Sequence, residues 1–124
     1  MLIKSTDQVE SFAAGDLTQI KELLHPDKDG LTLAYSLAHA SLAPNTASLP
    51  HHLNSSEVYY MLKGEGRMHI GGSTQMVKKG DIVYIPPFAA QYIENTGSEQ
   101  LEFLCIVDPA WRAEEEEVYD LSKD

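Results

Sequence analysis

Two neighbouring imidazoles, a carboxylate and a carboxamide are the side chains of this sequence best suited to chemistry. His51 and His52 precede Glu57, which lies on an apolar segment, and Gln91 lies on a second apolar segment further along. Imidazole and carboxylate are common ligands of divalent transition metals, and an amide oxygen is a weaker one. The residue types make His51, His52 and Glu57 candidate metal ligands. The candidate divalent ions are Fe, Mn, Ni and Zn.

The segment around Glu57 also supplies the candidate catalytic residues. Without a metal, Glu57 would be a general base, because an apolar interior raises the pKa of a carboxyl group. Side chains alternate between the two faces of a strand, so Tyr59 and Met61 share the face of Glu57. Tyr59 then lies beside the carboxylate and offers a hydroxyl. We take Glu57 and Tyr59 as the candidate catalytic residues.

Most of the chain alternates between short apolar segments and turns that contain Gly, Pro or Asn. This pattern is typical of an all-β sandwich or barrel with antiparallel strands. The expected strands are residues 31–39, 57–62, 67–70, 75–78, 82–85, 91–94 and 100–107. Outside them we expect a short helix over residues 5–14, either a helix or a strand over 19–24, and a polar helix or arm over 110–121.

Composition limits the classes of function. A chain of 124 residues forms one domain, and its net charge of -10 argues against a nucleic-acid groove or an anionic membrane surface. No apolar run approaches the roughly 18 residues of a membrane span, so we expect a cytoplasmic protein. The acidic run Glu114–Glu117 is typical of a solvated face or tail. Cys105 is expected to be a buried, inert thiol.

The other histidines have ordinary structural interpretations. His25 precedes Pro26, and His39 lies at the end of an expected strand, so both are expected to be surface or turn residues. His69 lies between Met68 and Ile70, which are the better candidates for the interior. His69 is therefore expected on the outer face.

Two segments resemble the two sequence motifs of the cupin superfamily. The matching positions are Glu57 and Gly64 in the first motif and Gly80, Pro86, Gln91 and Asn95 in the second. The resemblance covers residues 31–107 and implies a double-stranded β-helix, or jelly-roll, barrel. Residues 1–30 would then be an N-terminal extension, and residues 108–124 a C-terminal arm.

The resemblance also implies a metal site, and the sequence departs from it. Cupins often bind a divalent metal through two histidines and a glutamate of the first motif and a histidine of the second. Gln91 stands at the position of that last histidine, so the resemblance implies its amide oxygen as a further candidate metal ligand. Phe88 stands where a glycine is expected. The shell we expect would therefore hold metal less tightly than a three-histidine shell.

The first motif reads His51-His52 where the family has His-x-His. In one register His52 is the second histidine and Pro50 replaces the first. In the other, His51 is the first histidine and Leu53 replaces the second. Adjacent residues of a regular strand point to opposite faces, so both imidazoles reach one metal only if the chain is irregular there. Pro50 makes such irregularity plausible, since it restricts the backbone.

Three functions are open at this point. The resemblance implies a metal-dependent enzyme on a small polar molecule, and isomerases, dioxygenases, decarboxylases and lyases all occur on this fold. The alternatives are a non-catalytic module that binds a sugar or metabolite without metal, and a purely structural protein. We also expect a homodimer, because the edges of such a barrel need covering.

Overall fold

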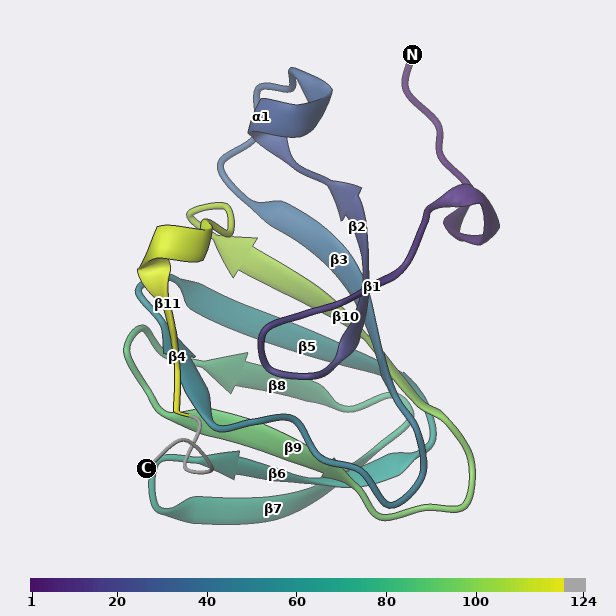
Figure 1. Cartoon of the computed structure of the whole chain (residues 1–124), viewed down its shortest axis with the longest axis vertical. Coiled ribbons are helices and arrows are strands. Elements are labelled where there is room, and N and C mark those ends of the chain that lie inside the picture. The colour runs from purple at the N-terminus through teal and green to yellow at the C-terminus, as the bar shows by residue number, and fades with distance from the viewer. Residues whose placement is uncertain (120–124) are drawn as a thin grey trace.

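Two antiparallel sheets face each other in the computed structural model, which describes residues 1–119 (Figure 1). The first sheet has the order β1 (Phe12–Ala13), β2 (Gln19–Leu24), β3 (Ser36–Leu42), β10 (Leu101–Asp108), β5 (Ser56–Lys63) and β8 (Ile82–Ile85). The second has the order β11 (Glu116–Val118), β4 (His51–Leu53), β9 (Gln91–Asn95), β6 (Glu65–Ile70) and β7 (Ser73–Lys78). The short helices are η1 (Thr6–Gln8), α1 (Pro26–Asp29) and η2 (Ala113–Glu115). The all-β, double-stranded β-helix expectation is confirmed.

The strands from residue 57 onward were well predicted. Residues 82–85 form β8 as expected, and the other strands of this region differ by one or two residues at their ends. The strand expected over 31–39 instead begins at Ser36 and continues to Leu42. Its start shifts because β3 pairs with β10, with Ser36 opposite Val107. Residues 19–24, for which the sequence allowed either a helix or a strand, form the strand β2.

The ends of the chain differ from the helices considered for them. The helix expected over residues 5–14 is wrong, since the structure has only the turn η1 and the short strand β1 there. A short helix with three apolar positions gains little without packing, whereas β1 finds a partner in β2. Residues 110–119 form an arm that ends in β11, paired with β4. The last two residues of the helix or arm expected over 110–121 lie outside the described residues.

Both segments flanking the barrel motifs add strands to its sheets. β2 extends the first sheet beside β3, and β11 extends the second beside β4. The division into an extension, a barrel and an arm at residues 30 and 107 stays a prediction. No helix within residues 1–119 is both long enough and apolar enough to cross a bilayer.

Alternation along the strands separates the core from the surface. In β5 the inward residues are Glu57, Tyr59 and Met61, and Tyr60 between them is exposed. The core fills one end of the space between the sheets, where Met61 packs with residues such as Phe103. Gly66 allows β6 to lie close to its neighbour β9, since a Cβ at this position would lie 2.5 Å from the carbonyl oxygen of Glu94. Towards Glu57 the interior becomes polar.

Candidate functional site

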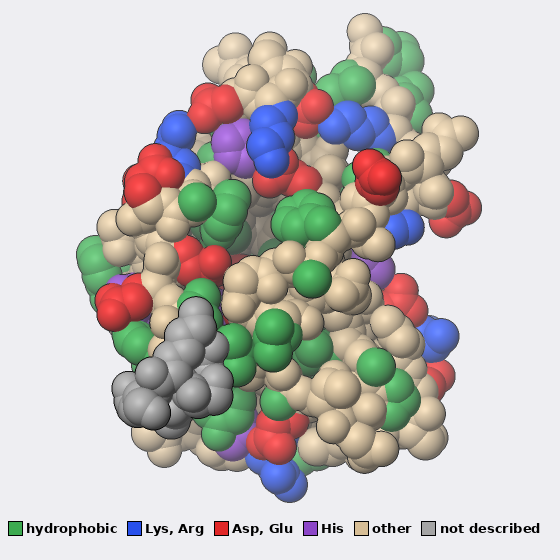
Figure 2. Space-filling view, viewed as in Figure 1, with side chains coloured by type: hydrophobic (Ala, Val, Ile, Leu, Met, Phe, Trp, Pro, Cys, Tyr) green, Lys and Arg blue, Asp and Glu red, His purple; other side chains and the backbone are tan. Residues whose placement is uncertain are grey.

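A cavity of about 180 Å³ lies at the polar end of the barrel. Figure 2 shows the hollowed face, with acidic and hydrophobic side chains around the opening. Residues from both sheets and from both flanking segments line it. The polar lining residues are Asp16, Thr18, Glu22, Ser36, His51, Glu57, Tyr59, Trp111 and Glu116. The volume is similar to that of cavities that hold a benzene-sized molecule, roughly 150 Å³.

A chain of hydrogen bonds joins the two sheets beside the cavity. The Tyr59 hydroxyl donates to Gln91 Oε1 at 2.9 Å, and Gln91 Nε2 donates to Glu57 Oε1 at 2.9 Å. Gln91 is 1% exposed and Glu57 is 6% exposed. The amide oxygen of Gln91, a predicted metal donor, therefore already accepts a hydrogen bond, and its amide group holds Glu57 in place.

His51 is the imidazole that enters the cavity. It is 3% exposed, and its register partner on β9 is Gln91. Its Nδ1 lies 2.9 Å from the carbonyl oxygen of Leu49. A carbonyl only accepts, so Nδ1 carries a proton, and in the neutral ring Nε2 presents a lone pair. That Nε2 lies 3.6 Å from Asp16 Oδ2.

His52 lies on the other side of β4 and does not line the cavity. Its ring packs against Phe88 and Tyr119, and its Nδ1 is hydrogen-bonded to the Tyr119 hydroxyl. Its Nε2 is 3.7 Å from the exposed carboxylate of Glu117. β4 is regular here, so the irregularity that would bring both imidazoles to one metal is absent from this strand. The second register is the one that the structure adopts.

In that register Leu53 occupies the position of the second motif histidine. Leu53 is buried and lines the cavity. The predicted set thus separates into His51, Glu57 and Gln91, which lie together, and His52, which does not. Phe88, at the expected glycine position, has a left-handed φ of 67°, which explains why the family favours glycine there.

Asp16 is a cavity residue that the sequence reasoning missed. It lies in the loop between β1 and β2, where the Leu49 amide donates to its carbonyl oxygen at 2.7 Å. Its Oδ1 accepts hydrogen bonds from the Thr18 amide at 3.1 Å and the Thr18 hydroxyl at 2.6 Å. An aspartate two residues before a threonine is typical of such a turn. This spacing could have revealed the loop, but not the cavity behind it.

Glu116 corrects the interpretation of the acidic run. The run was expected to be solvated, and Glu117 is indeed exposed. Glu116 is the neighbour of Glu117 on β11, so its side chain points to the opposite face of the strand, where it lines the cavity. A hydrogen bond with the Trp111 side chain helps to hold its carboxylate. The strand pairing of β11 with β4 therefore turns one member of the run inward.

Burial raises the pKa of groups around the cavity, among them Glu57, Glu116 and Tyr59. Burial raises the pKa of Glu57 from 4.5 to about 7, although the hydrogen bond from Gln91 and the nearby His51 oppose the rise. Burial also raises the pKa of Glu116, and the charge of Asp16 adds to the effect. The pKa of Tyr59 lies well above its ordinary value for the same reason, with Glu57 as the next cause. Tyr59 thus remains a neutral hydroxyl donor.

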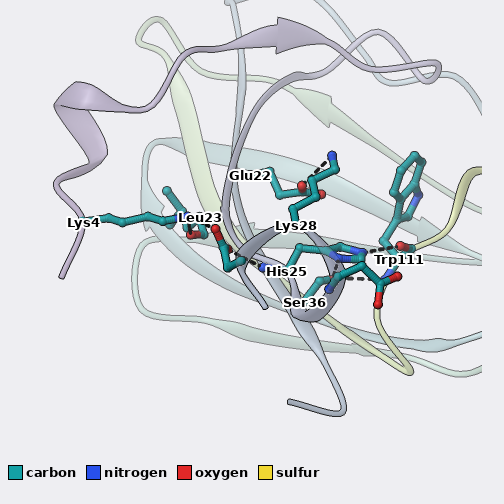
Figure 3. A network of polar contacts seen from close by, with 9 residues as sticks. Lys4, Glu22, Leu23, His25, Lys28, Ser36 and Trp111 are labelled. Atoms are coloured by element: carbon teal, nitrogen blue, oxygen red, sulfur yellow. Dashed lines mark hydrogen bonds and ion pairs between the residues drawn. The ribbon is translucent and has the colours of Figure 1, made fainter. Parts of the chain in front are cut away.

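A polar network ties the two flanking segments together beside the cavity (Figure 3). His25 Nε2 lies 2.8 Å from the Trp111 carbonyl oxygen, and the Trp111 amide donates to Ser36 Oγ at 2.9 Å. His25 also caps α1, accepting at Nδ1 from the Asp27 amide. His25 was expected to be a surface or turn residue. It lies at the turn into α1, but it is 5% exposed, so the surface alternative is wrong. The network fixes the arm that carries Trp111 and Glu116.

The remaining expectations for single residues are mostly met. His69 lies on the outer side of β6, where it stacks on Tyr92 and pairs with Glu94. His39 contacts Glu102 at 3.1 Å on the outer side of the first sheet. Cys105 is a buried free thiol, as expected.

The residues at the motif positions do not fit the metal set of the family. His51 and Glu57 are strong donors, but Leu53 has no donor atom and the amide oxygen of Gln91 is engaged by Tyr59. Within residues 1–119 no group of three or more His, Cys, Asp or Glu side chains is placed to hold a metal ion. Two strong donors are fewer than the three protein ligands usual in catalytic metal sites.

Comparisons with known proteins agree with this architecture. Residues 38–107 match the family model described as a cupin domain. An uncharacterized protein of Methanocaldococcus jannaschii is 37% identical over 116 residues, which cover 92% of this chain and 91% of that protein.

Two further similarities come from Thermotoga maritima. A protein named an oxalate-binding protein is 37% identical over 71 residues, which cover 56% of this chain and 59% of that protein. The crystal structure of a predicted oxalate decarboxylase has a TM-score of 0.77 at 24% identity, covering 87% of this chain and 99% of that one. The structural similarity supports the fold alone.

Proposed function

This chain belongs to the cupin family, and we propose that its barrel binds a small polar molecule in the cavity beside Glu57 without a resident metal. The observation that carries the proposal is the position of Gln91. Its amide group is engaged on one side by Tyr59 and on the other by Glu57. The side chain that replaces the second-motif histidine is therefore part of a protein hydrogen-bond chain.

The cavity retains what a binding module needs. Part of its wall is apolar, and polar groups converge on it from different elements, as is usual for small-molecule sites. A relative from Thermotoga maritima is named for binding oxalate, which supports small-molecule binding as the general function. The ligand itself is a separate question.

Glu57 and Tyr59, the candidate catalytic residues, have different roles in this proposal. A carboxyl with a pKa of about 7 can give or take a proton near neutral pH. Glu57 is thus suited to acid–base chemistry on a bound molecule. The hydroxyl of Tyr59 donates to Gln91, so Tyr59 is a positioning residue that acts through Gln91 on Glu57.

A metal-dependent enzyme is the second candidate. The observation in its favour is the tautomer of His51, because metal-bound histidines commonly donate their other ring nitrogen to a backbone carbonyl. Here Nδ1 donates to Leu49 and leaves Nε2 towards the cavity. This candidate requires Fe, Mn, Ni or Zn to find ligands in place of Leu53 and the engaged amide of Gln91.

Calorimetric titration in the presence and absence of EDTA distinguishes the two candidates. The protein would be titrated with a panel of small acids, amines, diols and sugars. We expect at least one ligand to bind equally with and without chelator, and to lose affinity in His51→Ala. His52→Ala is the matched control, because it removes the adjacent imidazole on the outer side of β4. Binding that disappears with EDTA, or that is unaffected by His51→Ala, would contradict the proposal.

We also propose that the chain forms a homodimer through the outer face of the first sheet. Tyr60 on β5 lies opposite Ile82 on the edge strand β8, and Tyr84 lies two residues further along β8. All three side chains are exposed apolar or aromatic groups. Contiguous exposed apolar surface of this kind is typical of protein interfaces.

A further inference from the structure

The cavity is lined by acidic groups from four different elements. Asp16 comes from the β1–β2 loop, Glu57 from β5, Glu116 from β11, and Glu22 from β2. None of the described residues that line the cavity is Lys or Arg. Lys28 contacts Glu22 at 2.7 Å from outside, with its own side chain 64% exposed (Figure 3). The basic group nearest to the interior is His51.

Most hydrogen-bond donors around the cavity are already engaged. The Thr18 amide and hydroxyl donate to Asp16, and the Gln91 amide donates to Glu57. The Tyr59 hydroxyl donates to Gln91. The Trp111 side chain bonds Glu116, and His51 Nδ1 donates to a backbone carbonyl. Among the described side chains of the wall, the Ser36 hydroxyl and the Cys105 thiol remain as donors that carry no charge.

The groups left over are acceptors inside the cavity. Glu57 is 6% exposed. Within residues 1–119 its Oε1 accepts the hydrogen bond from Gln91, and its Oε2 has no hydrogen-bond partner. His51 is 3% exposed, and the closest polar contact of its Nε2 is Asp16 Oδ2, at 3.6 Å. In the neutral ring this places a lone pair beside a carboxylate. A positively charged N–H group placed between His51 Nε2 and Asp16 Oδ2 would donate a hydrogen bond to each of them.

The apolar part of the lining limits the ligand to a short body. Ala38, Ala40 and Phe103 form part of its apolar wall, on strands of the same sheet as Glu22 and Glu57. An anion in the same space would face four acidic side chains with one imidazole to offset them. A dicarboxylate such as oxalate, bound without a metal, is therefore poorly matched to this cavity.

We infer that the ligand of this cavity is a small organic cation, an amine or amidine on a short apolar body, that donates N–H hydrogen bonds to Asp16 and Glu57. This inference rests on the proposed metal-independent binding function. It differs from the oxalate ligand that the name of one relative would imply. The acceptors Asp16 Oδ2, Glu57 Oε2 and His51 Nε2 are the recognition groups.

The test is calorimetry of metal-free protein with probes that share one apolar body. Benzylamine, benzyl alcohol and benzoate share a phenyl ring and carry a cationic, a neutral and an anionic group, and 1,4-diaminobutane and oxalate form a second comparison without a ring. We expect at least one amine to bind about tenfold or more tightly than its neutral and anionic counterparts. Asp16→Asn and Glu57→Gln should each lower amine affinity by about tenfold, in proportion to the lost charge-assisted hydrogen bond.

Glu117→Gln is the matched control, because Glu117 neighbours Glu116 on β11 but is exposed. It should leave amine affinity unchanged, and thermal melting would confirm that all three variants fold. Equal or tighter binding of benzoate or oxalate, full amine affinity in both Asp16→Asn and Glu57→Gln, or no binding by any probe would overturn the inference. Anion binding without metal would leave the proposed function intact, whereas anion binding only after addition of Mn²⁺ or Zn²⁺ would remove both.

Discussion

Gln91 Nε2 donates a hydrogen bond to Glu57 Oε1 at 2.9 Å, from a strand of one sheet to a strand of the other. Because the Tyr59 hydroxyl completes the chain at Gln91 Oε1, both ends of the amide have partners. This relationship distinguishes the site from the four-ligand metal centre that the family resemblance implies. It also fixes the carboxylate that faces the cavity.

Restoring the missing histidines should create a metal site. Leu53 and Gln91 are buried at the two motif positions where the family has histidine, next to His51 and Glu57. In the double variant Leu53→His/Gln91→His, three imidazoles and a carboxylate would converge, a set suited to Zn²⁺ or Mn²⁺. We expect about one metal ion per chain after dialysis against Zn²⁺, measured by elemental analysis, and a lower metal content in each single variant, which has one ligand fewer.

Adding His52→Ala to the double variant should not change its metal content, because His52 lies outside the cavity. A folded double variant that remains free of metal would show that the motif positions do not converge as described.

The stability of the protein should depend on the protonation of Glu57. Its folded pKa of about 7 lies above its ordinary value of 4.5, so the folded state binds the proton more tightly than the unfolded state. This contribution is therefore present below about pH 4.5 and is lost as the pH rises to about 7. The loss is on the order of 3 kcal/mol at most.

Glu57→Gln removes this titration and should flatten that part of the profile. Urea unfolding between about pH 5 and pH 8 would give the free energy of unfolding of both proteins. The difference between their pH profiles measures the contribution of Glu57. Since Glu116 also has a raised pKa, some pH dependence should persist in the variant. Parallel profiles for the two proteins would contradict the assignment of the raised pKa to Glu57.

The contact between Ser36 and Trp111 should stabilise the C-terminal arm. Ser36→Ala leaves the Trp111 amide without the acceptor that it has at 2.9 Å. We expect a loss of about 1–2 kcal/mol in the free energy of unfolding. Ser41→Ala on the same strand is the control and should change stability by less than about 0.5 kcal/mol. Equal effects of the two substitutions would show that Ser36 does not anchor the arm.

The proposed dimer predicts a specific sensitivity to charge. Ile82→Lys on β8 places a cation in the exposed apolar face that includes Tyr60 and Tyr84. We expect the wild type to sediment as a dimer and Ile82→Lys as a monomer. Met76→Lys, at a half-exposed position on β7 of the other sheet, should remain dimeric. A monomeric wild type, or dissociation of both variants alike, would contradict the proposed interface.

The strands and the inward face of β5 could be predicted from local pattern. The strand at residues 82–85 ends at two prolines, and alternation from Glu57 correctly places Tyr59 and Met61 inside. These features depend on neighbouring residues only. The choice between His51 and His52 depended on which register β4 adopts against β9, and this long-range pairing is not encoded in the local spacing.

The acidic side of the cavity could not be predicted for a related reason. Asp16 and Glu116 are separated by most of the chain, and they meet only because β2 and β11 extend the two sheets. Locally, Asp16 resembles a helix breaker and Glu116 belongs to a charged run. His25 is similar, since its burial comes from Trp111, far away in the sequence.

The most direct test of metal-independent binding is the metal content of the wild-type protein. The protein would be purified without chelators or affinity tags and then dialysed against Mn²⁺, Fe²⁺, Ni²⁺ or Zn²⁺. Because Gln91 is engaged by Tyr59 and Leu53 has no donor, we predict less than about 0.1 metal ion per chain by elemental analysis. About one ion per chain, lost on both His51→Ala and Glu57→Gln but kept in His52→Ala, would contradict it.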